Sequence, residues 1–143
     1  MKNCMEIKFK AIVENEAFAR NVVASFILPL NPSLSELEDI KTAVNEAVTN
    51  AIVHAYPDKT GHVTMKITTD NRKIQINISD NGVGIEDIER ALTPFYTSKP
   101  DQERSGMGFT VMESFMDKLK VESNKSGVTV SMLKEILPAV VEM

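Results

Sequence analysis

The chain has 143 residues, of which 43% are hydrophobic and 25% charged, as expected for one globular domain with a single core. A net charge of −4 and a pI near 5.2 argue against direct nucleic-acid binding, which normally needs a basic surface. No apolar run approaches the roughly 20 residues that span a bilayer, and no signal peptide is visible. The single cysteine, Cys4, has no partner for a disulfide. We therefore expect a cytoplasmic protein built as one domain over residues 1–143.

The N-terminal part of the chain predicts a strand followed by a helix. Apolar and polar residues alternate over residues 5–11, which is the period of a strand, and apolar residues recur at helical spacing over residues 18–30. The polar face of this helix carries Glu16, Arg20 and Asn21 and is expected to face solvent. An alternative hypothesis is that the strand and this helix carry a partner or dimer contact.

A second helix is predicted to begin at a capping box and to end at the Tyr-Pro pair at residues 56–57. Either Ser33 and Glu36 or Ser35 and Glu38 have the spacing of a capping box, in which a serine and a glutamate three residues apart satisfy the first free N–H groups.

This second helix is apolar except for one line of polar residues. Glu46, Asn50 and His54 follow each other at intervals of four residues, so they line one face. Because the rest of the helix is apolar enough to be buried, this polar line meets either solvent or a ligand that needs a carboxylate and an amide.

Two alternating strands at residues 63–68 and 74–78 follow, joined by a short Asp-Asn-Arg turn that suits a hairpin. The second strand leads to Asp80, directly before Gly82 and Gly84. Glycines free the backbone for positive φ and for close approach of another group. A carboxylate therefore stands at a strand end beside a turn that can touch a ligand.

The next segment predicts a short helix at residues 85–92 and a polar loop at residues 93–105. A loop of this length inside a compact domain is often a lid. Gly106 and Gly108 then open a helix whose apolar stripe runs over residues 109–119. A glycine-rich loop that leads into a helix N-terminus is an anion site, because free N–H groups and the helix dipole both point at the ligand.

A final hairpin is predicted from residues 120–124 and 128–133, and the chain from Leu137 onward is expected to fray. The alternating strands favour a mixed, mostly antiparallel sheet with helices on one face. The predicted fold class is therefore α/β (α+β), a two-layer sandwich.

These polar residues together suit a nucleotide. Asp80 can accept a hydrogen bond from the exocyclic amine of adenine, and the two glycine turns would approach the ring and the phosphates. Asn50 offers an oxygen to Mg²⁺, which prefers few protein ligands plus phosphates and waters. Glu46 can take a proton from an attacking hydroxyl, and Lys99 and Arg104 can neutralise phosphate charge.

Three stretches resemble motifs of the GHKL ATPase/kinase superfamily, in the same order and with similar spacing. Residues 45–51, NEAVTNA, resemble its N box; residues 80–84, DNGVG, resemble its first glycine box; and residues 106–109, GMGF, resemble its second. Thr129 resembles the superfamily's threonine near the nucleotide. Within the superfamily the chain looks most like the small stand-alone anti-sigma factor kinases, with which it shares NEAVTNAIVHAYP, SGMGF and MESFMDKL.

The resemblance implies a Bergerat ATP-binding fold, ATP or ADP with Mg²⁺, and a homodimer with two protein partners. One partner is a sporulation sigma factor held inactive, and the other is an anti-anti-sigma factor phosphorylated on serine. Neither nucleic acid nor a membrane is contacted directly. By carry-over, Glu46 resembles the catalytic base and Asn50 the Mg²⁺ ligand. The residues expected to bind the nucleotide are Asn50, His54, Asp80, Gly82, Gly84, Ile85, Thr97, Lys99, Arg104, Ser105, Gly106, Met107, Gly108, Phe109 and Thr129.

Several alternatives stay open. ATP can serve as a structural ligand in a nucleotide-gated sigma-binding module without kinase chemistry. The chain can also be part of a gyrase- or Hsp90-like machine, or a histidine-kinase catalytic domain whose phosphoacceptor is on another chain. The second glycine box has two glycines where many histidine kinases have three, which leaves the lid geometry open. His54 is either at the pocket edge or a structural histidine.

Overall fold

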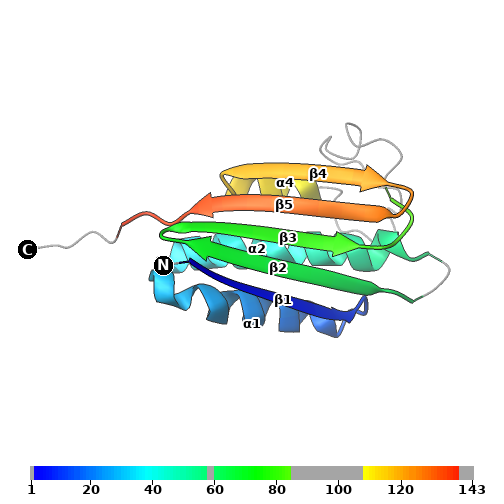
Figure 1. Cartoon of the computed structure of the whole chain (residues 1–143), viewed down its shortest axis with the longest axis horizontal. Coiled ribbons are helices and arrows are strands. Elements are labelled where there is room, and N and C mark those ends of the chain that lie inside the picture. The colour runs from blue at the N-terminus through cyan, green and yellow to red at the C-terminus, as the bar shows by residue number, and fades with distance from the viewer. Residues whose placement is uncertain (1, 58–59, 85–107, 139–143) are drawn as a thin grey trace, which may run out of the picture.

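The computed structural model describes residues 2–57, 60–84 and 108–138. They form a five-stranded sheet in the order β1-β2-β3-β5-β4, with the helices on one side of it (Figure 1). All the strand pairs of this sheet are antiparallel. The predicted two-layer α+β sandwich is confirmed. The elements are β1 (Lys2–Lys10), α1 (Asn15–Ile27), a 3₁₀ turn (Leu28–Leu30), α2 (Leu34–Asn50), a π-helical turn (Ala51–Ala55), β2 (His62–Asp70), β3 (Lys73–Asp80), α4 (Gly108–Phe115), β4 (Lys118–Asn124) and β5 (Gly127–Glu135).

The core lies between the sheet and the helices. The alternate residues Ile74, Ile76 and Ile78 of β3 are fully buried, and α2 covers them with a stripe that includes Ile40 and Val44. Burying an isoleucine side chain contributes about 1.5–3 kcal/mol relative to leaving it exposed. This burial decides which face of β3 points at the helices, and it therefore decides the direction of every side chain on that strand.

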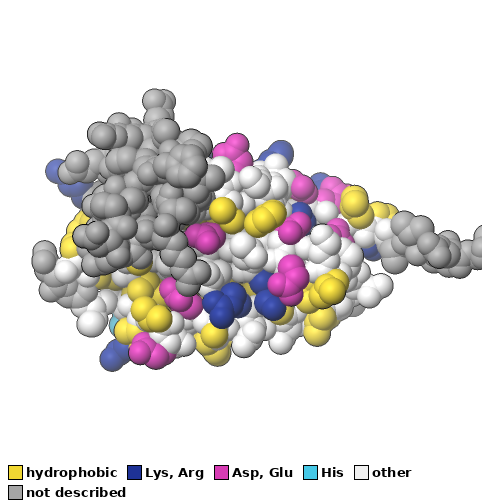
Figure 2. All heavy atoms as spheres, turned by 180° about the vertical axis from the view of Figure 1, so that it is seen from behind, with side chains coloured by type: hydrophobic (Ala, Val, Ile, Leu, Met, Phe, Trp, Pro, Cys, Tyr) yellow, Lys and Arg dark blue, Asp and Glu magenta, His cyan; other side chains and the backbone are white. Residues whose placement is uncertain are grey.

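The surface of the helical side carries charges of both signs. In Figure 2, acidic and basic side chains are interspersed with scattered hydrophobic ones over the described residues. Among the described residues, no helix is long and apolar enough to cross a membrane.

Helix α2 begins at the first of the two predicted capping boxes. The Ser33 hydroxyl oxygen accepts a hydrogen bond from Glu36 N at 3.1 Å, and Glu36 Oε1 accepts one from Ser33 N at 2.9 Å. The helix then continues as a π-helical turn beyond Asn50. Such turns are rare and often lie at functional sites.

The helix after the second glycine box is shorter than predicted. Helix α4 ends at Phe115, and Leu119 lies in β4. The chain begins to pair with β5 at Asp117, whose N–H donates to Leu133 O at 2.8 Å and whose Oδ2 accepts a hydrogen bond from Glu135 N at 2.7 Å. The helical spacing extends to Leu119 by coincidence. Leu119 faces the core from β4, so an apolar residue is expected there whether the segment is a helix or a strand.

The first two residues after β5, Ile136 and Leu137, are held more firmly than predicted. Leu137 N donates to Glu36 Oε2 at 2.9 Å, and Arg72 Nε donates to Ile136 O at 2.8 Å. The expectation of fraying is therefore wrong for the backbone of Leu137, although the Leu137 side chain is exposed. Residues 139–143 lie outside the described residues. The carboxylate of Glu36 serves both the capping box and this anchor, and these hydrogen bonds outweigh its desolvation and hold its pKa below the usual value.

Candidate functional site

Asp80 is the last residue of β3, on the side of the sheet that faces the helices. Its Oδ1 accepts hydrogen bonds from Gly82 N at 2.9 Å and from Val128 N at 3.2 Å. Among the described residues, no hydrogen bond is made to Oδ2, so one acceptor oxygen is left for a ligand. Burial raises the pKa of Asp80, and the two N–H donors oppose that rise without cancelling it. The side chain is thus fixed through one oxygen and available through the other.

Two glycines allow other backbone segments to approach Asp80 closely. A Cβ on Gly82 would lie 2.1 Å from Ala55 O, at the end of the π-helical turn, where Val83 N donates to the same oxygen at 2.9 Å. Gly127 has φ +130° and a Cβ there would lie 2.0 Å from Asp80 O. Either position excludes any larger residue. The glycines thus hold the helix end and the β4–β5 turn against the aspartate.

Helix α2 brings the N box against the beginning of α4. Glu46 and Asn50 are half-buried and lie one turn apart. A Cβ on Gly108 would lie 3.0 Å from Asn50 Nδ2 and 3.4 Å from Glu46 Oε2. A side chain at this position would be in tight contact with Asn50, so glycine lets α4 begin close to both groups without displacing them. The predicted base and the predicted Mg²⁺ ligand therefore lie beside the N-terminal end of a helix, where an anion is stabilised.

Helix α1 contacts the other side of the N box. Arg20 Nη1 donates to Asn45 Oδ1, and Thr49 Oγ1 donates to Glu16 Oε1 at 2.9 Å. The expectation that the polar face of α1 is only solvated is wrong for Glu16 and Arg20, although Asn21 is exposed.

These contacts were missed because each of the residues looks like an ordinary surface polar group. The available signal was a matched spacing, since Glu16 and Arg20, like Asn45 and Thr49, stand four residues apart. Asn45 and Thr49 directly precede the two site residues of α2. The pairing with α1 therefore helps to fix the rotation of the helix that presents Glu46 and Asn50.

The structure does not bring Thr129 to the site. Thr129 pairs with Ser79 in β3 and with Glu122 in β4. Its neighbours Val128 and Val130 both contact the core, and strand side chains alternate, so Thr129 points away from the helices and from Asp80. The prediction for Thr129 is corrected by one residue. Val128 takes the place beside Asp80 and contributes its backbone N–H.

The remaining predicted residues divide into those that the structure describes and those that it does not. Gly84 lies against the backbone of Asn124, His54 lies in the π-helical turn, and Phe109 packs against the core from α4. The others lie outside the described residues, as do the predicted short helix at residues 85–92 and the lid at residues 93–105; they are Ile85, Thr97, Lys99, Arg104, Ser105, Gly106 and Met107.

Within the described part of the chain, no group of three His, Cys, Asp or Glu side chains could hold a metal ion. A single amide oxygen such as that of Asn50 is instead the kind of donor that fits Mg²⁺ bound mainly by phosphates and waters.

Comparisons with known proteins identify the family of this chain. The profile of the histidine kinase-like ATPase domain matches residues 9–134, and the chain belongs to this family. It is 56% identical over 135 residues to the anti-sigma F factor of Clostridium acetobutylicum and 51% identical over 135 residues to that of Caldanaerobacter subterraneus, in each case over 94% of both chains. The RsbU and RsbW domains of a Mycobacterium tuberculosis protein give a TM-score of 0.65 at 14% identity, over 94% of this chain and 32% of that chain.

The family match confirms the superfamily resemblance drawn from the three motifs. The structural similarity supports the fold alone because its sequence identity is low. An ATPase domain binds a nucleotide, and among the described residues we expect Asp80, Asn50 and Gly108 to contact it. The role of each residue in it stays a prediction.

Proposed function

We propose that the chain is an anti-sigma factor of the cytoplasm that binds a sporulation sigma factor and, with Mg²⁺-ATP, phosphorylates a serine of an anti-anti-sigma factor. The observation that carries the kinase part is that α2 presents Glu46 and Asn50 together at the start of α4. The similarity to anti-sigma F factors at 51–56% identity supports the sigma factor as a partner.

The residues of the site fit the nucleotide. Asp80 Oδ2 would accept the exocyclic amine of adenine, whereas guanine has a carbonyl oxygen at the corresponding place and would set acceptor against acceptor. Asn50 would contribute an oxygen to Mg²⁺, and the N-terminal end of α4 would face the phosphates.

Glu46 would act as the general base of the phosphoryl transfer. Mg²⁺-ATP, when bound, provides the phosphoryl group. As the serine oxygen bonds to phosphorus and ADP leaves, Glu46 accepts the hydroxyl proton, a role that contributes roughly 10²–10⁴ in rate. A module that only senses nucleotide needs no base at this position.

The function is tested by mixing the purified protein, Mg²⁺-ATP and an anti-anti-sigma protein and reading both masses intact. We expect the anti-anti-sigma protein to gain one phosphate on serine. The same sample without Mg²⁺ is the control. Tight ATP binding with nucleotide-dependent sigma binding but no transfer would identify the alternative, a nucleotide-gated binding module without kinase chemistry.

A homodimer through β1 and α1 is part of the proposal. In the described sheet, β1 is an edge strand paired only with β2, and an open edge is a template for another strand. Next to it, on α1, Phe18 is 48% exposed and stacks edge-on against Phe9 at 6.2 Å between ring centroids. A second copy of the chain would cover this apolar surface.

We expect sedimentation analysis to show a dimer and Phe18→Asp to give monomers, because a buried charge at the contact would be unpaired. Leu34→Asp is the matched control, since Leu34 is also exposed but lies at the start of α2. A dimer that persists in the Phe18 variant would rule out this surface.

A further inference from the structure

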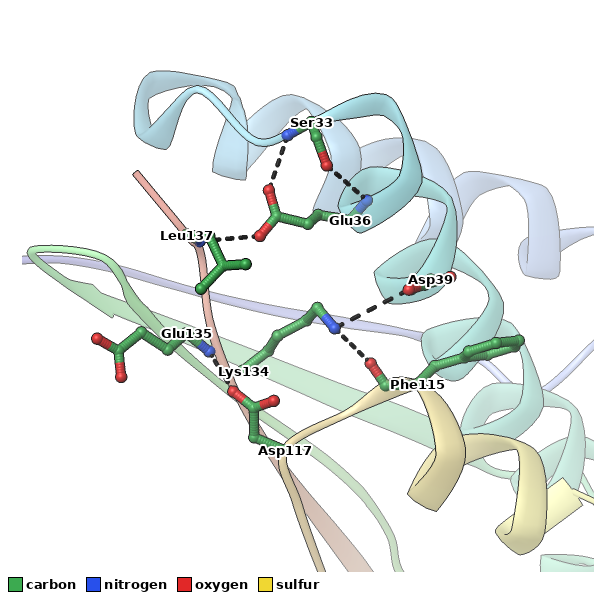
Figure 3. Close-up of polar contacts among 8 residues, drawn as sticks. All are labelled: Ser33, Glu36, Asp39, Phe115, Asp117, Lys134, Glu135 and Leu137. Carbon is green, nitrogen blue, oxygen red and sulfur yellow. Dashed lines mark hydrogen bonds and ion pairs between the residues drawn. The ribbon is translucent and has the colours of Figure 1, made fainter. Parts of the chain in front are cut away.

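The cation that binds the C-terminal end of helix α4 comes from another element. No basic residue lies in the last turn of α4, although a cation there would stabilise the free carbonyls and the negative end of the dipole. Lys134 of β5 supplies it. Its Nζ donates to Phe115 O at 2.7 Å and lies 4.0 Å from Asp39 Oδ2 on α2 (Figure 3).

The direction of Lys134 follows from the strand on which it lies. It has the same orientation as Val130 and Met132, which face the helices, so its side chain enters the helical layer and is only 13% exposed. A lysine at this depth needs partners. The carbonyl of Phe115 in α4 and the carboxylate of Asp39 in α2 provide them, and Lys134 thereby joins the sheet, α2 and α4 (Figure 3).

The other end of α4 is the one that meets the site. Helix α4 runs from Gly108, beside Asn50 and Glu46, to Phe115, where Lys134 binds. An eight-residue helix is about 12 Å long, and we treat it as one rigid unit because its backbone hydrogen bonds link each turn to the next. A change of tilt at Phe115 therefore displaces the N–H groups at Gly108.

We propose that Lys134 is a positioning residue for the nucleotide site: by fixing the C-terminal end of α4 it sets where the N-terminal end of that helix meets the phosphates. This inference rests on the proposed nucleotide site. It predicts that loss of Lys134 weakens nucleotide binding without any contact between Lys134 and the nucleotide.

Arg72 offers a matched control. It too is a cation that holds backbone carbonyls at this end of the sheet, since its Nε donates to Ile136 O and its Nη2 donates to Leu137 O. Its partners belong to the chain after β5 and not to α4. Arg72→Met thus removes a comparable anchor but leaves the ends of α4 unchanged.

The experiment measures the ATP dissociation constant and the thermal midpoint of the full chain and of Lys134→Met, Lys134→Arg and Arg72→Met. Lys134→Met is expected to weaken ATP binding by roughly 2- to 30-fold. Lys134→Arg should restore it because arginine can still donate to Phe115 O. Arg72→Met should lower the midpoint and leave the ATP affinity unchanged. If Lys134→Met does not fold, Lys134→Gln, which keeps a polar end but loses the charge and the reach, takes its place.

Normal ATP affinity in Lys134→Met would overturn the inference. An equal loss in Arg72→Met would overturn it too, because it would show that the ATP affinity only follows the stability of the fold. If the unmodified chain binds no ATP, the proposed nucleotide site itself fails and the inference fails with it. The two failures are distinguished by the unmodified protein.

Discussion

Asp80→Asn is expected to weaken ATP binding by about 10- to 100-fold and to leave the fold intact. The asparagine can keep its oxygen toward Gly82 and Val128, which both donate to Oδ1. Its NH₂ group then replaces Oδ2 and meets the amine of adenine donor to donor. An unpaired polar group in a buried site costs about 1–3 kcal/mol, which corresponds to the expected loss.

Asp80→Asn is also expected to change how the stability of the fold depends on pH. Because burial raises the pKa of Asp80, the folded chain holds the proton more tightly than the unfolded chain. Ionising Asp80 above that pKa therefore costs stability, and the cost disappears as the pH falls through it. We expect Asp80→Asn to melt no lower than the unmodified chain at pH 7, and the difference to shrink at acid pH.

Isothermal titration with ATP and thermal melts at two pH values test both points. Asp70→Asn is the control, because Asp70 is exposed at the far end of β2. Normal ATP affinity in Asp80→Asn would remove the adenine role, and a large fall in the melting temperature would show that the site and the fold cannot be separated at this residue.

Glu46→Gln is expected to reduce phosphoryl transfer by roughly 10²–10⁴-fold with little change in ATP affinity. Glutamine has the size of glutamate, so it preserves the close packing of Glu46 against Gly108. It cannot accept a proton from the serine hydroxyl at neutral pH. The loss should therefore fall on the rate of the chemical step.

Single-turnover transfer to the anti-anti-sigma protein, followed by intact mass, measures this rate. Glu38→Gln is the matched control, since it makes the same change on α2 at an exposed position that pairs only with Lys41 among the described residues. A fully active Glu46 variant would mean that Glu46 is not the general base. An equal loss in both variants would point to the stability of α2.

The sequence predicts most of the fold because each layer has a clear period. The alternation that buries Ile74, Ile76 and Ile78 identifies β3, and the capping box at Ser33 identifies the start of α2. Asp80 and Gly108 are predicted as site residues because a carboxylate and a glycine stand at element ends, and Asn50 because it continues the polar line of Glu46 on an otherwise apolar helix. These signals are local, so a single sequence contains them.

The parts that the sequence did not predict depend on register and on long-range pairing. Val128 and Thr129 are neighbours on β5, so their side chains point to opposite faces of the sheet. Only the pairing with β3 decides which of them faces Asp80. The end of α4 depends on the contact between Asp117 and β5, and the polar face of α1 depends on α2. A local sequence pattern does not show which distant residues will be in contact.

The donors to Asp80 have a consequence for how the site assembles during folding. One donor is two residues away along the chain, but the other, Val128 N, is 48 residues away. Such non-local contacts form only after a large entropy of loop closure has been overcome. The proposed adenine acceptor is thus oriented only once β5 has paired with β3. We therefore expect ATP to bind the completed domain in preference to a partly folded chain, and so to stabilise the completed domain.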